Sequence, residues 1–301
     1  MEEFLQQLIN GLAVGGIYAL IALGYTMVYG VLKLINFAHG DLFTYGGYLG
    51  LTLLTSLALQ GRVGTAAAIA ILVIMVMGLV GIMGVVLERA AYRPLRESPR
   101  LSAVVSALGG SIFLQNMLML VYGARFQVYP EGLLPQTTIG LFGIQVPLVR
   151  ILVVLASVVM MTALYLFVQK TKIGTAVRAA AIDQGAARLM GIDVNKVVSL
   201  VFLVGPALGG AAGLLVGLYY GQVNFTMGWT YGMKAFTAAI LGGIGNIPGA
   251  MLGGFLLGVI EALGAAYLSV AWKDAIAFGV LILILIVRPT GLLGERVAEK
   301  V

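Results

Sequence analysis

The sequence contains no cysteine and a single histidine, His39, in 301 residues. Disulfides and thiolate metal sites are therefore excluded, and a transition-metal site would lack its usual ligands. Charged residues are also scarce, at 10% of the chain, against about 25% in soluble domains. With 60% hydrophobic residues and a mean hydropathy of +1.04, a chain of this length cannot bury its apolar surface in its own interior. Lipid is therefore the expected solvent for much of the chain.

The phosphate-binding loop of ATPases is missing as well. That loop needs Gly-Lys followed by Ser or Thr, and the sequence contains no Gly-Lys pair. The glycine-rich stretch LGGIGNIPGAMLGG, residues 241–254, has no lysine and is interpreted as a close-packed break between helices. A clustered nucleophile or metal set, which a lipid-modifying enzyme would need, is not found either. The chain is expected not to be an enzyme and to bind no cofactor itself.

Eight segments have the length and apolar character of membrane-spanning helices, which need about 20 apolar residues. Their continuous apolar runs lack a two-residue alternation, which favours helices over a barrel. The acidic start, MEEFLQQLIN, is unlike a secretory signal, so the first segment is expected to be retained. The predicted fold is an all-α polytopic helical bundle forming one transmembrane domain over 1–301. The segments are 9–32, 42–59, 65–88, 102–122, 149–168, 197–220, 248–270 and 275–288, plus a short or re-entrant glycine-rich helix at 230–245.

Basic residues gather in two loops, 88–100 and 169–196, which predicts that both loops face the cytoplasm. Counting spans backwards then places the N-terminus outside. The basic C-terminus is cytoplasmic only if 230–245 crosses the membrane at least partly. The residues that carry this argument are Arg89, Arg93, Arg96, Arg100, Lys170, Lys172, Arg178, Arg188 and Lys196.

Glycines recur at four-residue spacing between 205 and 221. Such a repeat stays near one helix face and forms a smooth strip where another backbone approaches closely. The preferred interpretation is helix packing, and the alternative is a surface on which helices slide. The strip consists of Gly205, Gly209, Gly213, Gly217 and Gly221.

Ionisable and amide side chains interrupt the apolar segments, where such groups are costly and often functional. The stretch NFAHGD at 36–41 is interpreted as a structured reversal near the cytoplasmic edge, with Asp41 capping the second span; substrate or proton contact is the alternative. Glu261 is either hydrogen-bonded within the bundle or lines the path. Lys234 either snorkels to the interface, which is slightly preferred, or attracts a substrate carboxylate. Translocation-path or gate candidates are Asn36, His39, Asp41, Lys234, Asn246 and Glu261.

The loop 169–196 is predicted to contain a helix from about Thr175 to Met190, ended by Gly191 as a C-cap glycine. Either this helix lies on the membrane surface or it docks into a cytoplasmic partner. Its alanine-rich character fits a protein groove better than a bilayer, which favours bulky side chains.

Three stretches together resemble the branched-chain amino acid permease family of ABC importers. They are AAIDQGAARLMGI at 180–192, GGIYALIALGYTMVYGVLKLINFAHGDLFTYGGYLG at 15–50, and AFTAAILGGIGNIPGAMLGGFLLGVIEAL at 235–263. The resemblance implies a coupling helix at about 174–191 that contacts the ATPases. The coupling residues it implies are Arg178, Ala180, Ala181, Asp183, Ala187, Met190 and Gly191.

The resemblance further implies a multi-pass subunit of the bacterial inner membrane that imports leucine, isoleucine, valine or related apolar amino acids by alternating access. Its implied partners are a second homologous permease, two ATP-binding cassette subunits that hold ATP and Mg, an external substrate-binding protein and membrane lipid, with no nucleic acid. The alternative kept open is a proton-coupled secondary transporter that uses His39, Asp41 and Glu261.

Overall fold

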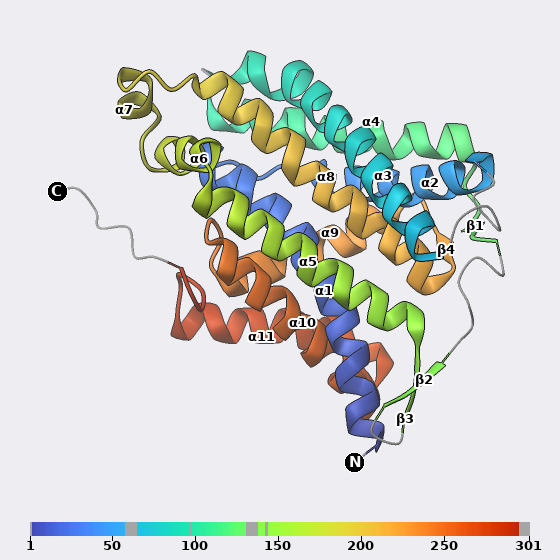
Figure 1. Ribbon diagram of the computed structural model, residues 1–301. Coiled ribbons are helices and arrows are strands. Elements are labelled where there is room, and N and C mark those ends of the chain that lie inside the picture. Colours follow the sequence, from blue (N-terminus) through green and yellow to red (C-terminus); the bar gives the residue numbers. More distant parts are fainter. Residues whose placement is uncertain (1, 58–64, 97, 131–137, 142–143, 295–301) are drawn as a thin grey trace.

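The computed structural model describes residues 2–57, 65–96, 98–130, 138–141 and 144–294 (Figure 1). Most of these residues are helical, and two short antiparallel strand pairs, β1–β4 and β2–β3, lie in connections. The helices are α1 Glu2–Leu32, α2 His39–Leu57, α3 Thr65–Leu87, α4 Arg100–Tyr122, α5 Leu148–Lys170, α6 Lys172–Ile182, α7 Gln184–Leu189, α8 Val194–Tyr220, α9 Met227–Gly242, α10 Ile247–Tyr267 and α11 Lys273–Val287. The strands are β1 Gln127–Val128, β2 Thr138–Leu141, β3 Ile144–Pro147 and β4 Gln222–Val223.

Within the described residues, seven helices are long and apolar enough to cross a membrane. They correspond to α1, α3, α4, α5, α8, α10 and α11, each beginning and ending within a few residues of a predicted span except that α1 starts earlier, at Glu2. Of the remaining predicted span, 42–59, residues 42–57 belong to α2, and 58–59 lie outside the described residues. Helix α2 carries many glycines and polar residues and is not among the seven. The chain is therefore a polytopic all-α membrane protein, and a count of eight spans stays a prediction.

The centre of the bundle is formed by α1 and α8, which are mostly buried, whereas α4 and α11 are mostly exposed. Helix α1 packs along α10, and α8 packs against α2 and α3. Glycine permits these contacts because backbone meets backbone. A Cβ on Gly40 of α2 would clash with Gly228 of α9, and one on Gly228 would clash with Gly40. The same reciprocal contact joins Gly242 and Gly249.

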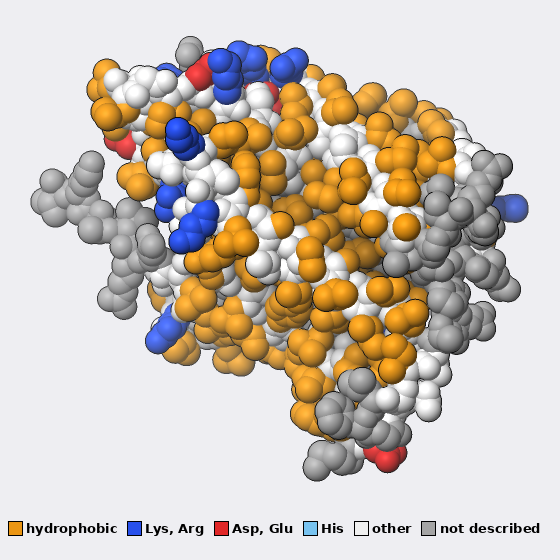
Figure 2. Space-filling view, viewed as in Figure 1, with side chains coloured by type: hydrophobic (Ala, Val, Ile, Leu, Met, Phe, Trp, Pro, Cys, Tyr) orange, Lys and Arg blue, Asp and Glu red, His pale blue; other side chains and the backbone are white. Residues whose placement is uncertain are grey.

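The two ends of the bundle differ in charge. We call the end that holds the last turn of α1, the helices α6 and α7, the first turn of α8 and the last turns of α9 and α11 the basic end. Figure 2 shows Lys and Arg side chains gathered over this end and hydrophobic side chains over the face formed by α3, α5 and α8. The N-terminus lies at the opposite end, near β2 and β3 (Figure 1). This separation is the one that the predicted orientation requires.

The glycine-rich segment 230–245 forms α9, whose last turn lies at the basic end. At that end α9 contacts the segment that follows α11: the amides of Leu292 and Leu293 donate to the carbonyls of Leu241 and Gly242. Helix α9 begins at Met227, inside the bundle beside the first turns of α2, where Gly228 contacts Gly40. It therefore covers only part of the bundle's length and returns the chain to the basic end.

Helix α2 begins deeper than the sequence indicated. Its first residue, His39, lies beside Gly24 of α1 and Gly209 of α8. Gly24 precedes the last residue of α1 by eight positions, which is about 12 Å along the helix. The prediction that 36–41 lies at the edge of the spans is therefore wrong: after α1 ends, the chain turns back into the bundle before α2 starts. Tertiary packing of glycines decides this, and no local pattern reports it.

Candidate functional site: buried polar groups and the basic end

The polar side chains of the reversal are completely or almost completely buried. Asn36 and His39 are 0% exposed, and Asp41 is 5% exposed. The Tyr92 hydroxyl donates to Asn36 Oδ1 at 2.7 Å, which ties the reversal to the turn that follows α3. The imidazole of His39 packs edge-on against the Tyr25 ring, with 4.8 Å between ring centroids. Asn36 and His39 thus hold the returning chain between α1, the end of α3 and α8.

Asp41 does not cap α2 as predicted. The helix starts two residues earlier, and the Leu42 amide donates to the Ala38 carbonyl. Asp41 instead lies in the first turn, where a carboxylate still interacts favourably with the helix dipole. Its Oδ2 accepts a hydrogen bond of 2.5 Å from the Ser111 hydroxyl of α4. The carboxylate therefore joins α2 to α4, a helix that is otherwise mostly exposed.

A second set of buried charges lies nearer the N-terminal end and joins four helices. Lys234 of α9 lies between Glu261 Oε1 of α10, at 2.8 Å, and Asp274 Oδ1 of α11, at 2.7 Å. The Tyr18 hydroxyl of α1 donates to Glu261 Oε2 at 2.9 Å. The Lys234 side chain is only 6% exposed. The preferred interpretation that it snorkels to the interface is therefore wrong, because two carboxylates hold it inside the bundle.

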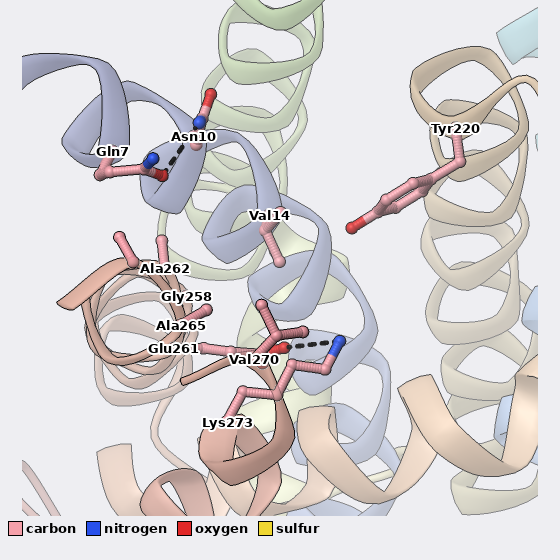
Figure 3. Close-up of a pocket in the computed structure, with 11 residues that line it drawn as sticks. Gln7, Asn10, Val14, Tyr220, Gly258, Glu261, Ala262, Ala265, Val270 and Lys273 are labelled. Atoms are coloured by element: carbon pink, nitrogen blue, oxygen red, sulfur yellow. Dashed lines mark hydrogen bonds and ion pairs between the residues drawn. The ribbon is translucent and has the colours of Figure 1, made fainter. Parts of the chain in front are cut away.

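A pocket opens beside this network (Figure 3). Its volume is about 360 Å³, and its lining includes Glu261, Lys273 and Asn10 among small apolar residues of α1 and α10. Lys273 Nζ lies 3.8 Å from Glu261 Oε1. One cation and one carboxylate therefore face the same pocket at the end opposite the coupling loop.

Asn246, another path candidate, has a structural role. Its Oδ1 accepts from the Gly249 amide and caps α10, and its Nδ2 donates to the Leu293 carbonyl at 2.8 Å. Both contacts fix the turn between α9 and α10 to the segment that follows α11.

Four of the five strip glycines on α8 lie at crossings with other elements, and the fifth does not. Gly221 has φ of +70°, ends α8, and would place a Cβ in open space. It is a C-cap and not a packing residue, which corrects the prediction. The packed positions are Gly205 beside Gly24, Gly209 against His39, Gly213 against the Phe43 carbonyl, and Gly217 against the Tyr129 ring.

The coupling loop forms two helices instead of the single helix expected at 174–191. Helix α6 ends at Ile182, and Asp183 caps α7 by accepting from the amides of Gly185 and Ala186 at 2.8 and 3.0 Å. A capping aspartate competes with helix continuation, which accounts for the break. The C-cap prediction at Gly191 is confirmed, because its φ is +82° and its amide donates to the Arg188 carbonyl.

The exposed surface of α6 and α7 differs from the predicted coupling residues. Ala180 and Ala187 are buried against the protein's own helices, at 1% and 3% exposed, and Ala181 is half-buried. Arg178, Asp183, Met190 and Gly191 face outward. The sequence interpretation missed two apolar residues, Ile182 and Leu189, which are 88% and 90% exposed. The sequence does contain a signal for them, because Ile182 directly precedes the capping residue Asp183 and Leu189 lies two residues before the C-cap glycine Gly191.

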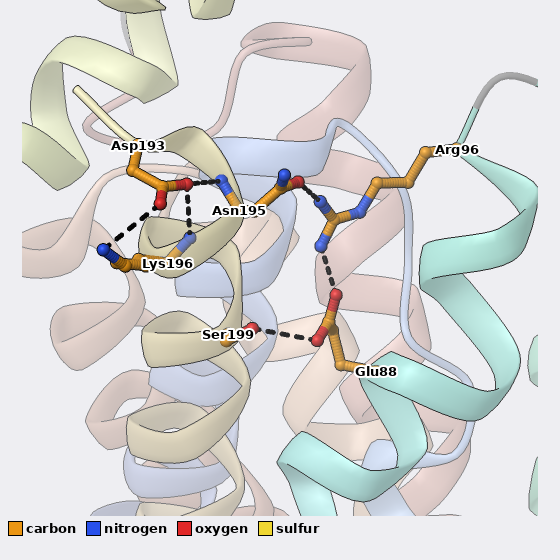
Figure 4. A network of polar contacts seen from close by, with 6 residues as sticks. All are labelled: Glu88, Arg96, Asp193, Asn195, Lys196 and Ser199. Atoms are coloured by element: carbon orange, nitrogen blue, oxygen red, sulfur yellow. Dashed lines mark hydrogen bonds and ion pairs between the residues drawn. The ribbon is translucent and has the colours of Figure 1, made fainter. Parts of the chain in front are cut away.

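At the basic end, a polar network joins the end of α3 to the start of α8 (Figure 4). Glu88 is 0% exposed and pairs with Arg96, and its Oε2 accepts from the Ser199 hydroxyl at 3.0 Å. Arg96 also donates to Asn195 Oδ1 at 2.6 Å. Asp193 caps α8 through the amides of Asn195 and Lys196. These contacts fix the loop 93–96 on α8.

The fold and the site define a multi-pass membrane protein with a few buried charged groups inside the bundle and two short helices, α6 and α7, at its basic end. The model of a family described as the permease component of a branched-chain amino acid transport system matches residues 7–285. The chain belongs to this family.

Curated relatives match over nearly the full chain. It is 44% identical over 303 residues to the high-affinity branched-chain amino acid transport system permease protein BraD of Pseudomonas aeruginosa, covering 99% of this chain and 98% of the relative. It is 43% identical over 301 residues to the corresponding permease protein LivH of Escherichia coli K12, with the same coverage. A probable branched-chain amino acid transport permease protein LivH of Methanocaldococcus jannaschii is 28% identical over 282 residues, covering 91% of this chain and 88% of the relative.

Proposed function

We propose that this chain is the permease subunit of an ATP-driven importer for branched-chain amino acids. Its relatives in two bacteria are named as permease proteins of such high-affinity transport systems and match along their whole length. The chain has no Gly-Lys pair and therefore no phosphate-binding loop. ATP and Mg are accordingly assigned to separate ATPase subunits, and this subunit is not itself an enzyme.

The contact with the ATPases is inferred from three exposed apolar residues of α6, α7 and the turn after α7, which we call the apolar tip. Ile182, Leu189 and Met190 are 88%, 90% and 82% exposed. Ile182 ends α6, Leu189 ends α7 and Met190 follows it, and both helices lie at the basic end (Figure 1). An exposed group of large apolar side chains on such a polar end indicates a protein contact. We assign this contact to the two ATPase subunits.

The docking helices are connected to the spanning helices by short links, so a movement of the tip reaches the bundle. Only Thr171 separates α5 from α6, and its side chain caps α6 by accepting from the Gly174 amide. Gln184 of α7 donates to the Val31 carbonyl of α1 at 2.7 Å. Closure of the ATPases would therefore move α1 and α5 together, which is the motion that alternating access requires.

The remaining partners and the orientation follow from charge. Cytoplasmic loops carry an excess of Lys and Arg, which assigns the basic end to the cytoplasm of a bacterial cell with this protein in its inner membrane. The N-terminus is then external and the C-terminus cytoplasmic. A second homologous permease would complete the membrane path, and an external binding protein would deliver the amino acid to the N-terminal end.

Uptake measurements separate this function from proton-coupled transport. The permease, its ATPases and its partner permease are reconstituted in liposomes with the binding protein outside, and entry of labelled leucine is followed. Uptake should require ATP inside and persist when a protonophore collapses the proton gradient. Uptake that is driven by the gradient without ATP would favour the secondary transporter and refute the proposal.

The docking site is tested by placing a charge at the apolar tip. Leu189→Glu should abolish co-purification of the ATPase subunits while the permease still inserts into the membrane. Trp272→Glu is the matched control, because Trp272 is also an exposed apolar residue, at 64%, but lies at the other end. If both variants retain the ATPases equally, the tip is not the docking surface.

A further inference from the structure

A basic groove lies between α3 and α8 at the basic end, apart from the buried charges and the docking tip. Its volume is about 480 Å³. Arg89 and Arg93 line it from the turn that follows α3, and Lys196 and Asp193 line it from the start of α8. Deeper in the groove the lining becomes apolar, with Val85, Leu200 and Leu203.

The groove has a net positive charge. Lys196 Nζ lies 3.4 Å from Asp193 Oδ2, whereas Arg89 and Arg93 have no ion-pair partner among the described residues. The Lys196 amide holds the pKa of Asp193 below its usual range, so that carboxylate stays ionised and remains on the first turn of α8. The three cations Arg89, Arg93 and Lys196 and the one carboxylate of Asp193 give the groove a net charge of plus two. Because Arg96 pairs with the buried Glu88, the guanidinium groups at this end of α3 that have no ion pair among the described residues are those of Arg89 and Arg93.

A second, apolar groove lies further along α3 and α8. The second groove, of about 220 Å³, lies between α3, α5 and α8 and is lined only by apolar side chains, including Met77, Ala163 and Leu208. On α8, Leu203 lines the basic groove and the next residue, Val204, lines the apolar one. On α3, Met77 of the apolar groove lies about 12 Å along the helix from Val85 of the basic groove.

We propose that these two grooves together bind one anionic phospholipid of the cytoplasmic leaflet. The headgroup phosphate lies among Arg89, Arg93 and Lys196, and an acyl chain follows the apolar groove past Leu208. Basic pockets between spanning helices on the cytoplasmic side are suited to anionic headgroups. A net charge of two disfavours a zwitterionic headgroup, whose ammonium would meet three cations. A soluble phosphate would use the basic part of the groove and leave the apolar part empty.

The test measures stabilisation of the purified full-length chain by added lipid. Palmitoyl-oleoyl phosphatidylglycerol is titrated into the protein in a neutral detergent, and the midpoint of the rise in melting temperature is compared with that for phosphatidylcholine. Each surface cation contributes a factor of about five to anionic-lipid binding. Replacing Arg89, Arg93 and Lys196 with Gln should therefore shift the phosphatidylglycerol midpoint on the order of 100-fold.

The matched control removes three cations from the same end that do not line the groove. Lys170, Lys172 and Arg288 are exposed there, and their replacement with Gln should leave the midpoint within about twofold. If the two triple variants lose affinity equally, the attraction comes from the general charge of the end, and the specific site is refuted. Arg93→Gln alone, at an exposed position, should shift the midpoint about fivefold and serves if the triple variant does not fold.

Two further measurements in the same assay distinguish binding of a lipid from binding of a soluble anion. Inorganic phosphate and glycerol phosphate carry the charge without a tail and should not raise the melting temperature at the lipid's midpoint concentration. Ala163→Trp fills the apolar groove and should weaken phosphatidylglycerol binding while all three cations remain. Stabilisation by inorganic phosphate equal to that by the lipid, or an unchanged midpoint in Ala163→Trp, would overturn the proposal.

Discussion

Replacing Lys234 with Met should destabilise the bundle strongly, because it leaves the buried carboxyl group of Glu261 without its nearest cation. Lys234 Nζ is 2.8 Å from Glu261 Oε1, and the two side chains are 6% and 9% exposed. Lys273, the next cation, is 3.8 Å away and 41% exposed, so it is only a weak substitute. Methionine has a similar length and is apolar, which keeps the change to the charge.

The magnitude follows from burial. Breaking a buried ion pair by removing one partner costs about 3–5 kcal/mol. Asp274 adds little, because its side chain is 54% exposed and exposed pairs contribute about 0–1 kcal/mol. Lys273→Met, the matched control, removes an equally long lysine from the same carboxylate and should cost under about 1 kcal/mol.

A second substitution identifies the cause. In Lys234→Met with Glu261→Gln, no buried charge is left unpaired, because Asp274, which also loses Lys234, has a side chain that is 54% exposed. The amide oxygen of Gln can still accept the hydrogen bond from Tyr18. The double variant should therefore be more stable than Lys234→Met alone. The assay is unfolding of the purified chain by added sodium dodecyl sulfate in mixed micelles, followed by loss of helical circular dichroism, for all four proteins.

Two outcomes would refute the reasoning: Lys234→Met no less stable than Lys273→Met, or a double variant less stable than Lys234→Met. Leucine uptake by the double variant in the complete reconstituted system then decides the role of the network. Restored stability with restored uptake means that the charges only hold α9, α10 and α11 together. Restored stability without uptake means that they act in transport.

Three further tests concern other parts of the structure. Gly213→Ala places a Cβ against the Phe43 carbonyl and should lower the stability of the protein by about 1–3 kcal/mol or more. Gly109→Ala, in open space on α4, should raise the stability by up to about 1 kcal/mol, and equal unfolding midpoints of the two variants would contradict the packing. Gly191→Val meets a φ of +82° and should lower leucine-coupled ATP hydrolysis with normal insertion, and full coupling would argue against the docking helices. Asp41→Asn retains an acceptor for the Ser111 hydroxyl and should keep most uptake, whereas Asp41→Leu should impair assembly; normal assembly without uptake in Asp41→Asn would show a direct charge role.

The sequence predicted most helices because their signals are local. Apolar runs of sufficient length and the glycine at 191 are visible in the chain itself, and the structure agrees on both. The helix break at Asp183 also has a local sequence signal, since aspartate favours a helix N-cap. The alanine-rich sequence on either side nevertheless indicated a continuous helix. The depth of His39 in the bundle and the contact between Lys234 and Asp274 could not be predicted from the sequence. Both depend on how helices distant in the sequence pack, and no spacing within one segment encodes them.

The reciprocal glycine contacts have a consequence for suppressor genetics. Where two side chains pack, a larger residue on one helix is commonly rescued by a smaller one on the other. At Gly40 and Gly228, and at Gly242 and Gly249, the obstacle to a new methyl group is the facing main chain. No substitution removes a main-chain atom, so a second-site change in the partner glycine cannot restore the fit. Selections for suppressors of alanine at these positions should therefore return true revertants or distant stabilising changes, and pairs of compensating residues at the contact should be absent.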